Sequence, residues 1–155
     1  MRQIKLTQST LSYPVISKMK VHTTNYLNTF VEIAADSPIA HGTVPPAKGE
    51  KKTVANLQFD IISKNPYRFT SDDVLFQVFA SKNDLTDPEH EEARRKFFSK
   101  GQACFRASPL TKKYGWGIHN NEEGKIALYG AETPMYEKLV KDKEVDKVKA
   151  MRSSK

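Results

Sequence analysis

Residues 101–130 read GQACFRASPLTKKYGWGIHNNEEGKIALYG, and this stretch carries the clearest signals of the fold. Two strand-like runs, Trp116–His119 and Lys125–Tyr129, flank the segment Asn120–Gly124, which ends in glycine. A short connection containing glycine between two β-prone runs is typical of a β-hairpin. We therefore expect the second half of the chain to contribute a hairpin to a sheet.

The residues just before this hairpin predict a short strand and then a single helical turn. Ala103–Ala107 has the composition of a strand, and Ser108 can cap a helix whose first residue is Pro109. Gly115 then supplies the glycine that commonly follows a helix. This order places Arg106 on a strand directly before a helix start.

Three helices are predicted upstream. Thr53–Lys64 has apolar residues at helical spacing and ends before Pro66, and Thr70–Lys82 begins with a hydroxyl cap and two acids. Glu89–Lys100 has acids at its start and bases at its end, with Gly101 as its C-cap. The runs FDII in the first helix and VLFQVFA in the second also have strand-like composition, which leaves a strand open there.

The remaining segments complete an α+β pattern. Tyr26–Ala34 is rich in β-branched and aromatic residues and predicts the first strand, whereas residues 36–52 contain three Pro and two Gly and predict a long loop. Thr133 and Pro134 open a last helix. The tail from residue 145 either adds an edge strand or frays. We expect a small antiparallel sheet that includes the hairpin, with three to four helices packed on one face.

The length and composition indicate one globular domain. A chain of 155 residues, 38% hydrophobic and 28% charged, can bury a substantial core. It has no apolar run of the ~18 residues that a membrane span needs. The single cysteine, Cys104, excludes an intramolecular disulfide, and the N-terminus lacks the apolar core of a secretory signal, so we expect a cytoplasmic protein.

Residues 1–18 predict a flexible extension that precedes a domain over residues 19–155. They are polar, include Pro14 and have no sustained helical or strand period. Met19 could be a second start of translation. A transit peptide is the alternative, because the segment has bases, serines and threonines but no acid.

The basic charge is concentrated at the two ends of the chain. The net charge is +7, yet residues 19–136 hold 15 bases against 14 acids. Residues 1–18 have three bases and no acid, and residues 137–155 have seven bases against four acids. Nucleic-acid binding through these termini is one functional hypothesis, although no nucleic-acid-binding motif accompanies the charge.

Several segments together resemble a family of small bacterial proteins described as a domain of unknown function. The segments are HTTNYLNTFVEIAADSP, KKTVANLQFDIISKNPYRFTSDDVLFQVFA, FFSKGQACFRASPLTKKYGWGIHNNEEGKIALYG and KVKAMRS. The similarity covers residues 22–153. It implies a self-contained domain that begins near Met19, and it implies no activity, ligand or catalytic residue.

No catalytic or cofactor motif with fixed spacing is present. There is no Walker A loop, no Rossmann glycine pattern and no G-x-S-x-G. The four His have neither helix-spaced partners nor a cysteine cluster, so we expect no metal site and no cofactor. Cys104 and His119 could form a nucleophile and its base, but a Cys between Ala103 and Phe105 is also typical of a core position.

The strongest candidate is an anion or polar-ligand site beside the hairpin. Arg106 offers a guanidinium fork for carboxylate or phosphate, and the N–H groups of a helix starting at Ser108 attract anions. Trp116 could stack on a ligand or fill the core instead. The candidate set is Arg106, Ser108, Lys112, Lys113, Tyr114, Trp116 and His119.

Three functions follow from these observations. The first is a non-catalytic cytoplasmic domain that binds a small anionic or polar ligand or a protein partner. The second is a small enzyme that acts on an anionic metabolite through Arg106 and His119. The third is nucleic-acid binding through the basic termini. Oligomeric state and ligand identity do not follow from the sequence.

Overall fold

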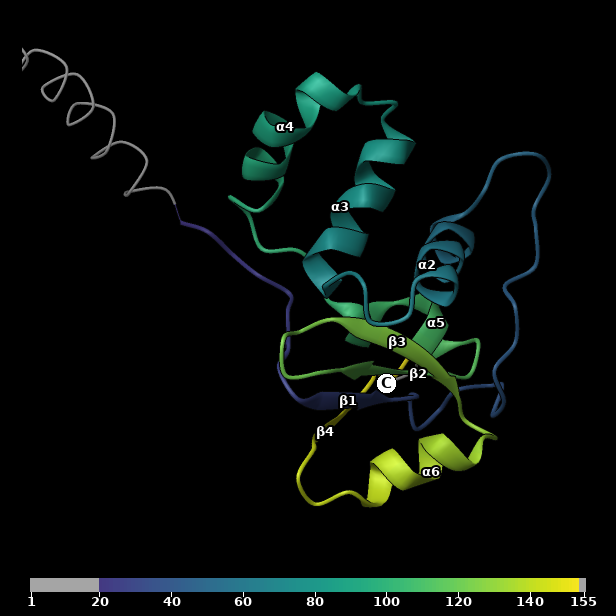
Figure 1. Cartoon of the computed structure of the whole chain (residues 1–155). Coiled ribbons are helices and arrows are strands. Elements are labelled where there is room, and N and C mark those ends of the chain that lie inside the picture. Colours follow the sequence, from purple (N-terminus) through teal and green to yellow (C-terminus); the bar gives the residue numbers. More distant parts are fainter. Residues whose placement is uncertain (1–19, 154–155) are drawn as a thin grey trace, which may run out of the picture.

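The structure, a computed structural model, describes residues 20–153 and is organised around a four-stranded sheet. The strands lie in the order β3-β2-β1-β4, with helices on both sides (Figure 1). Their bounds are β1 Thr29–Glu32, β2 Trp116–Asn120, β3 Ile126–Gly130 and β4 Asp146–Lys149. The predicted hairpin is present as β2 and β3, and the α+β fold class is confirmed. The predicted extension, residues 1–18, lies outside the described residues.

The central strand β1 pairs differently with its two neighbours. Val31 lies opposite Ile118 in the antiparallel pairing with β2 and opposite Val148 in the parallel pairing with β4. The sheet is therefore mixed, whereas the sequence predicted an antiparallel one. The reason is that helix α6 (Pro134–Lys141) connects β3 to β4 as a crossover, and strands joined in this way run parallel. The tail, for which two alternatives were open, forms the edge strand β4.

Four helices lie on one side of the sheet (Figure 1). The first two begin with reciprocal capping boxes, in which Thr53 pairs with Asn56 and Thr70 pairs with Asp73. These caps favour helices over the strands that the local composition left open. The bounds on this side are α2 Val54–Lys64, α3 Ser71–Lys82, α4 His90–Phe97 and α5 Pro109–Lys112, with 3₁₀ turns η1 Asp87–Glu89 and η2 Phe105–Ala107.

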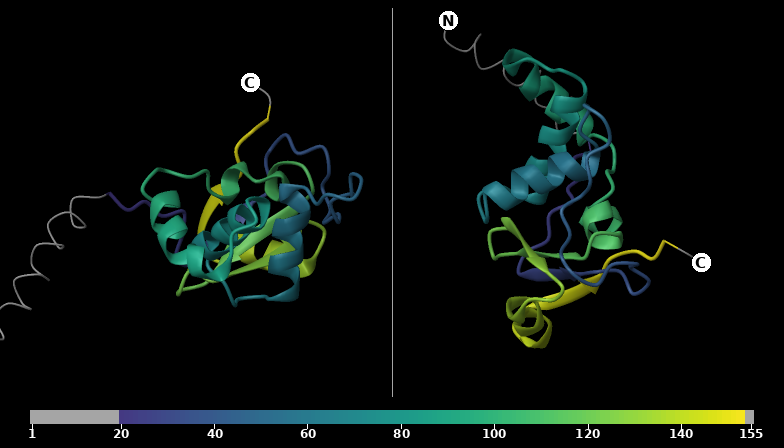
Figure 2. Two further views of the ribbon diagram at one scale, coloured as in Figure 1. Left: turned by 90° about the horizontal axis from the view of Figure 1, so that it is seen from above. Right: turned by 90° about the vertical axis from the view of Figure 1, so that its right-hand side faces the viewer.

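The main core lies between the sheet and α2, α3 and α5. Val31 and Ile118 project from the strands and are fully buried against Ile62, Val74 and Leu110 from the helices. Helix α4 packs further out, on α3 (Figure 2). This layer therefore has two interfaces, one with the sheet and one between α3 and α4.

The other face of the sheet is covered by α6, so helices lie on both faces, not on one (Figure 2). Successive strand residues point to opposite faces, and Phe30 accordingly packs on Leu139 and Val145 while its neighbour Val31 joins the main core. Helix α6 starts as predicted, with Thr133 as the cap and Pro134 as the first residue.

The segment that contains Arg106 is not a strand. Ala107 N donates to Cys104 O at 2.9 Å and Ser108 N donates to Phe105 O at 3.2 Å, which makes the 3₁₀ turn η2. A strand needs a neighbouring strand to pair with, and this segment lies over the face of the sheet with Phe105 buried in the main core. The predicted strand Ala103–Ala107 is therefore wrong.

Two further contacts fix the outer parts of the domain. Asp72, at the start of α3, accepts hydrogen bonds from Thr23 Oγ1 and from Thr24 N and Oγ1, each at 2.7 Å. At the β3 edge of the sheet, Tyr67 N donates to Ile126 O at 2.8 Å, so the link between α2 and α3 lies against β3. Within residues 20–153, no helix has the length and apolar character that a bilayer span requires.

Candidate functional site

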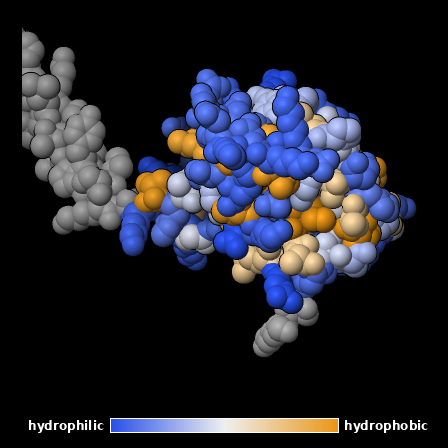
Figure 3. All heavy atoms as spheres, turned by 90° about the horizontal axis from the view of Figure 1, so that it is seen from below, coloured by the Kyte–Doolittle hydropathy of each residue, from blue (hydrophilic) through white to orange (hydrophobic). Residues whose placement is uncertain are grey.

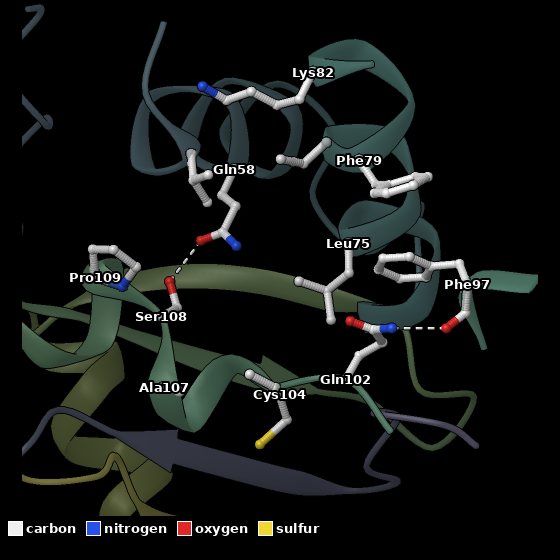
Figure 4. Close-up of a pocket in the computed structure, with 13 residues that line it drawn as sticks. Gln58, Leu75, Phe79, Lys82, Phe97, Gln102, Cys104, Ala107, Ser108 and Pro109 are labelled. Carbon is white, nitrogen blue, oxygen red and sulfur yellow. Dashed lines mark hydrogen bonds between the residues drawn. The ribbon is translucent and has the colours of Figure 1, made fainter. Parts of the chain in front are cut away.

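An apolar hollow of about 360 Å³ lies between α2, α3 and residues 102–109 (Figure 4). Leu75 and Phe79 are four residues apart on α3, which places both side chains on the face that borders the hollow. On the other side of the hollow the chain presents Ala103 and Ala107, whose side chains are single methyl groups. The space exists because these small side chains do not fill it.

Gln58, on α2, places an unused hydrogen-bond donor in this hollow. Its side chain is buried, with 4% of the residue exposed. Its Oε1 accepts from Ser108 Oγ at 2.6 Å, and Ser108 Oγ in turn accepts from Leu110 N at 3.0 Å. Its Nε2 donates to no other residue in 20–153, and Figure 4 shows this end of the amide turned toward the hollow.

Gln102 provides an acceptor in the same hollow. Its Nε2 donates to Phe97 O at 2.7 Å, which fixes the orientation of the amide. Its Oε1 points toward the hollow in Figure 4. An amide donor and an amide acceptor are therefore held by protein contacts within a mainly apolar wall, as is common in sites for small molecules.

A second hollow of about 470 Å³ adjoins the first. The two share Phe79, Phe97 and Gln102 in their walls, and the Phe79 and Phe97 rings are in contact between them, with centroids 4.8 Å apart. Lys96 and Lys100 line the second hollow. We call the two hollows together the α3 groove.

Of the seven predicted ligand residues, only Ser108 lines the α3 groove. Arg106 donates from Nε to Lys149 O at 2.7 Å, at the end of β4. The helix start at Ser108 has no free donor, because Leu110 N donates to Ser108 Oγ and the next two N–H groups, of Thr111 and Lys112, donate to Ser108 O. The donors of the helix start are therefore already used, and Arg106 uses its Nε–H, while anion binding by the rest of its guanidinium stays a prediction.

The aromatic candidates have structural contacts. Trp116 donates from Nε1 to Thr43 O at 2.8 Å and packs on Phe59, with ring centroids 5.4 Å apart. Lys113 Nζ lies 5.8 Å from the ring centroid of Tyr114. Lys112 is half-buried and Lys113 exposed. Trp116 thus fills a space under the loop of residues 36–52, and ligand binding by this set stays a prediction.

His119 lies on the opposite face of the sheet, beside α6. Its neighbour Ile118 packs under the helices of the main core, so His119 points the other way. His119 Nδ1 is 2.8 Å from Tyr67 Oη, which is also 2.8 Å from Tyr129 Oη. Burial lowers the pKa of His119, and the nearby Asp142 carboxylate opposes this shift in part. The neutral imidazole is therefore the favoured form.

Cys104 and His119 cannot act as a nucleophile and its base. Cys104 lines the α3 groove on the helix side of the sheet, and Figure 4 shows its sulfur pointing away from the hollow. Its Sγ lies 3.8 Å from Tyr26 Oη. His119 lies across the sheet. Among residues 20–153 no cluster of three His, Cys, Asp or Glu side chains could hold a metal ion.

The α6 side of the molecule has a different character. Seen from below, its surface is mainly hydrophilic, with hydrophobic residues exposed in a band across it (Figure 3). A hollow beside α6 is lined by Glu32, Glu132 and Glu137, among others. This acidic hollow contrasts with the α3 groove, whose walls contain lysines and no acid.

Apart from Ser108 and Cys104, sequence reasoning missed the residues that form the groove. Gln58 carried a detectable signal, because it is four residues after Val54 and four before Ile62, in a row of α2 that is otherwise apolar. A polar side chain in such a row needs a partner. Gln102 and Lys100 carried no comparable signal, since only the fold brings them beside α3.

The chain belongs to the family described as "Family of unknown function (DUF6157)", which matches residues 21–155. This confirms the resemblance to a domain of unknown function over nearly the whole described chain. Comparison with curated proteins gives no match. Comparison with solved structures gives none either. The family assigns no activity, so function has to be argued from the α3 groove itself.

Proposed function

We propose that this protein is a non-catalytic cytoplasmic domain of a bacterial cell that binds a small ligand in the α3 groove. The ligand has an apolar body and one neutral polar group. The observation that carries the proposal is the Gln58 amide, a buried side chain whose Nε2 donor is turned into an apolar hollow and is not used by residues 20–153.

A ligand with a carbonyl or amide group would complete this hydrogen bonding. Gln58 Nε2 is open to solvent in the hollow, so a ligand acceptor would replace water there, at a net gain of about 0.5–1.5 kcal/mol. Gln102 Oε1 could accept from an N–H or O–H of the same ligand group. The apolar part of the ligand would contact Leu75, Phe79 and Phe97, at roughly 25 cal/mol for each Å² removed from water.

The proposal can be tested with octanamide, which has an apolar chain and one amide. Ligand-detected NMR titration should give a Kd on the order of 1 mM or tighter, as expected for a ligand of this size. Ala107→Leu and Ala103→Leu each place a larger side chain in the hollow, and either should weaken binding about tenfold.

Ala131→Leu is the matched control. Ala131 is half-buried like Ala107 but lines the hollow beside α6, so this variant should bind octanamide as the unaltered chain does. Absence of binding to the unaltered chain would reject the proposal. So would equal binding by two filling variants that remain folded.

A further inference from the structure

We infer that the ligand of the α3 groove is an elongated acid, with its neutral polar group at Gln58 and Gln102 and a carboxylate at Lys96 and Lys100. This inference rests on the function proposed above. It adds the length of the ligand and its charge.

The first observation is that the two hollows adjoin. The hollow with Gln58 and the hollow with Lys96 and Lys100 share Phe79, Phe97 and Gln102. The Phe79 and Phe97 rings are in contact, with centroids 4.8 Å apart, so an apolar chain whose head group is held at Gln58 would cross over this ring pair to reach the end of α4. A ligand that fills only the first hollow would leave the second one to water.

The second observation is the charge of the groove. Its walls contain Lys82, Lys96 and Lys100 and no Asp or Glu. The neighbouring bases on α4 are already paired, Arg94 with Asp73 and Arg95 with Glu92. By contrast, Lys96 and Lys100 form no ion pair with any residue in 20–153, and both are exposed.

The third observation concerns the position of the charges relative to the apolar wall. Phe97 lies between the two lysines in sequence and lines both hollows, and Leu85 and Ala93 line the same end of the groove. A carboxylate can bind the ammonium groups at the rim while its chain stays on apolar side chains. Residues 1–18 carry only basic charges, and like charge disfavours them as the occupant.

The test compares two ligands that differ only in the far end. Octanamide carries the amide alone, and 8-amino-8-oxooctanoate carries the same amide with a carboxylate at the other end of the chain. The acid should bind about tenfold more tightly at low salt, since each exposed ion pair contributes modestly. This preference should shrink as salt is added.

The double variant Lys96→Gln, Lys100→Gln should bind both ligands equally and should bind octanamide as the unaltered chain does. The matched control is Lys112→Gln, Lys113→Gln, which removes the same charge outside the groove and should keep the preference. Amide acids of six and ten carbons are compared in the same way, to find the chain length that fits best.

The outcomes separate this inference from the proposed function. If octanamide binds but no amide acid binds more tightly, the inference that the ligand carries a carboxylate is rejected, and the proposed binding function stands. If the Lys112→Gln, Lys113→Gln variant loses the preference for the acid, the carboxylate binds at Lys112 and Lys113, among the residues predicted from the sequence, and its position at Lys96 and Lys100 is rejected. If neither ligand binds, both the inference and the proposed function are rejected.

Discussion

Tyr67 is the bulkiest of the non-glycine residues with a positive φ in the described part of the chain. Its φ of 60° is left-handed, which is costly for a bulky side chain. The compensation is visible in its hydroxyl, which lies 2.8 Å from both His119 Nδ1 and Tyr129 Oη. This arrangement joins the link between α2 and α3 to the α6 face of the sheet.

Removal of this hydroxyl should destabilise the domain. Tyr67→Phe keeps the ring but removes both hydrogen bonds, so the free energy of unfolding in urea should fall by about 1–2 kcal/mol. Tyr114→Phe is the control, because the hydroxyl of this half-buried tyrosine has no hydrogen-bond partner in residues 20–153. Equal stability of the two variants would contradict this role for Tyr67.

His119 should make the stability depend on pH. Burial lowers its pKa in the folded state from an ordinary 6.5, while Asp142 raises it in part. The unfolded chain then binds a proton more readily, so stability is unaffected well above pH 6.5 and falls as the pH drops below that value, levelling off below the folded pKa. Urea unfolding between pH 7.5 and about pH 5 measures this.

The variant His119→Gln should reduce this pH dependence, whereas His41→Gln, at an exposed position, should not. A pH profile identical in the unaltered chain and in His119→Gln would show that His119 does not contribute. Tyr67, the hydrogen-bond neighbour of His119, stays protonated across this range because burial raises the pKa of Tyr67 far above it.

At the scale of elements, α6 packs so closely on β2 that position 117 of the strand has to be a glycine. A Cβ on Gly117 would lie 2.6 Å from both Phe30 Cζ and Tyr136 Cε2. Gly117→Ala should therefore lower the free energy of unfolding by about 1–3 kcal/mol, because the two rings would have to move. Gly101→Ala is the control, since within residues 20–153 its added Cβ would contact only His22 Nδ1, at 3.8 Å. A neutral Gly117→Ala would contradict the close packing of α6.

The segment before β1 is held to α3 by Asp72. Asp72→Asn replaces one acceptor oxygen with a donor beside Thr23 and Thr24, and should cost about 1–3 kcal/mol of stability. Amide hydrogen exchange at residues 22–25 should increase. Asp60→Asn, which breaks an exposed pair with Lys52, should cost under about 1 kcal/mol. Unchanged exchange in Asp72→Asn would argue against the attachment.

Elements with local signals were predictable from the sequence. The capping residues Thr53 and Thr70 identify α2 and α3, and the loop Asn120–Gly124 identifies the hairpin. The wrong predictions concern segments whose structure is decided by contacts with distant parts of the chain. Ala103–Ala107 has strand composition but no strand to pair with, and the parallel pairing of β4 follows from the α6 crossover. Gly101 was also predicted as a C-cap, whereas α4 ends at Phe97 with Phe98 as its C-cap.

At the scale of the whole molecule, the candidate site forms between segments far apart in the sequence. The predicted ligand residues, from Arg106 to His119, are close together in the sequence. In the structure, however, Ser108 and His119 lie on opposite faces of the sheet. The α3 groove instead brings Gln58 from α2 together with Phe79 from α3 and Gln102 from the segment before η2. No local pattern could show this, because the groove depends on how α3 packs against residues 102–109.

The most direct test of ligand binding in the α3 groove is an NMR titration of the ¹⁵N-labelled chain with octanamide, observed at the glutamine side-chain NH₂ groups. We predict that the Gln58 and Gln102 signals shift saturably with one Kd, while the backbone signals of Ala127 and Tyr129, on β3, stay unchanged. Unshifted Gln58 and Gln102 signals at saturating octanamide, or shifts confined to the α6 side of the sheet, would contradict it.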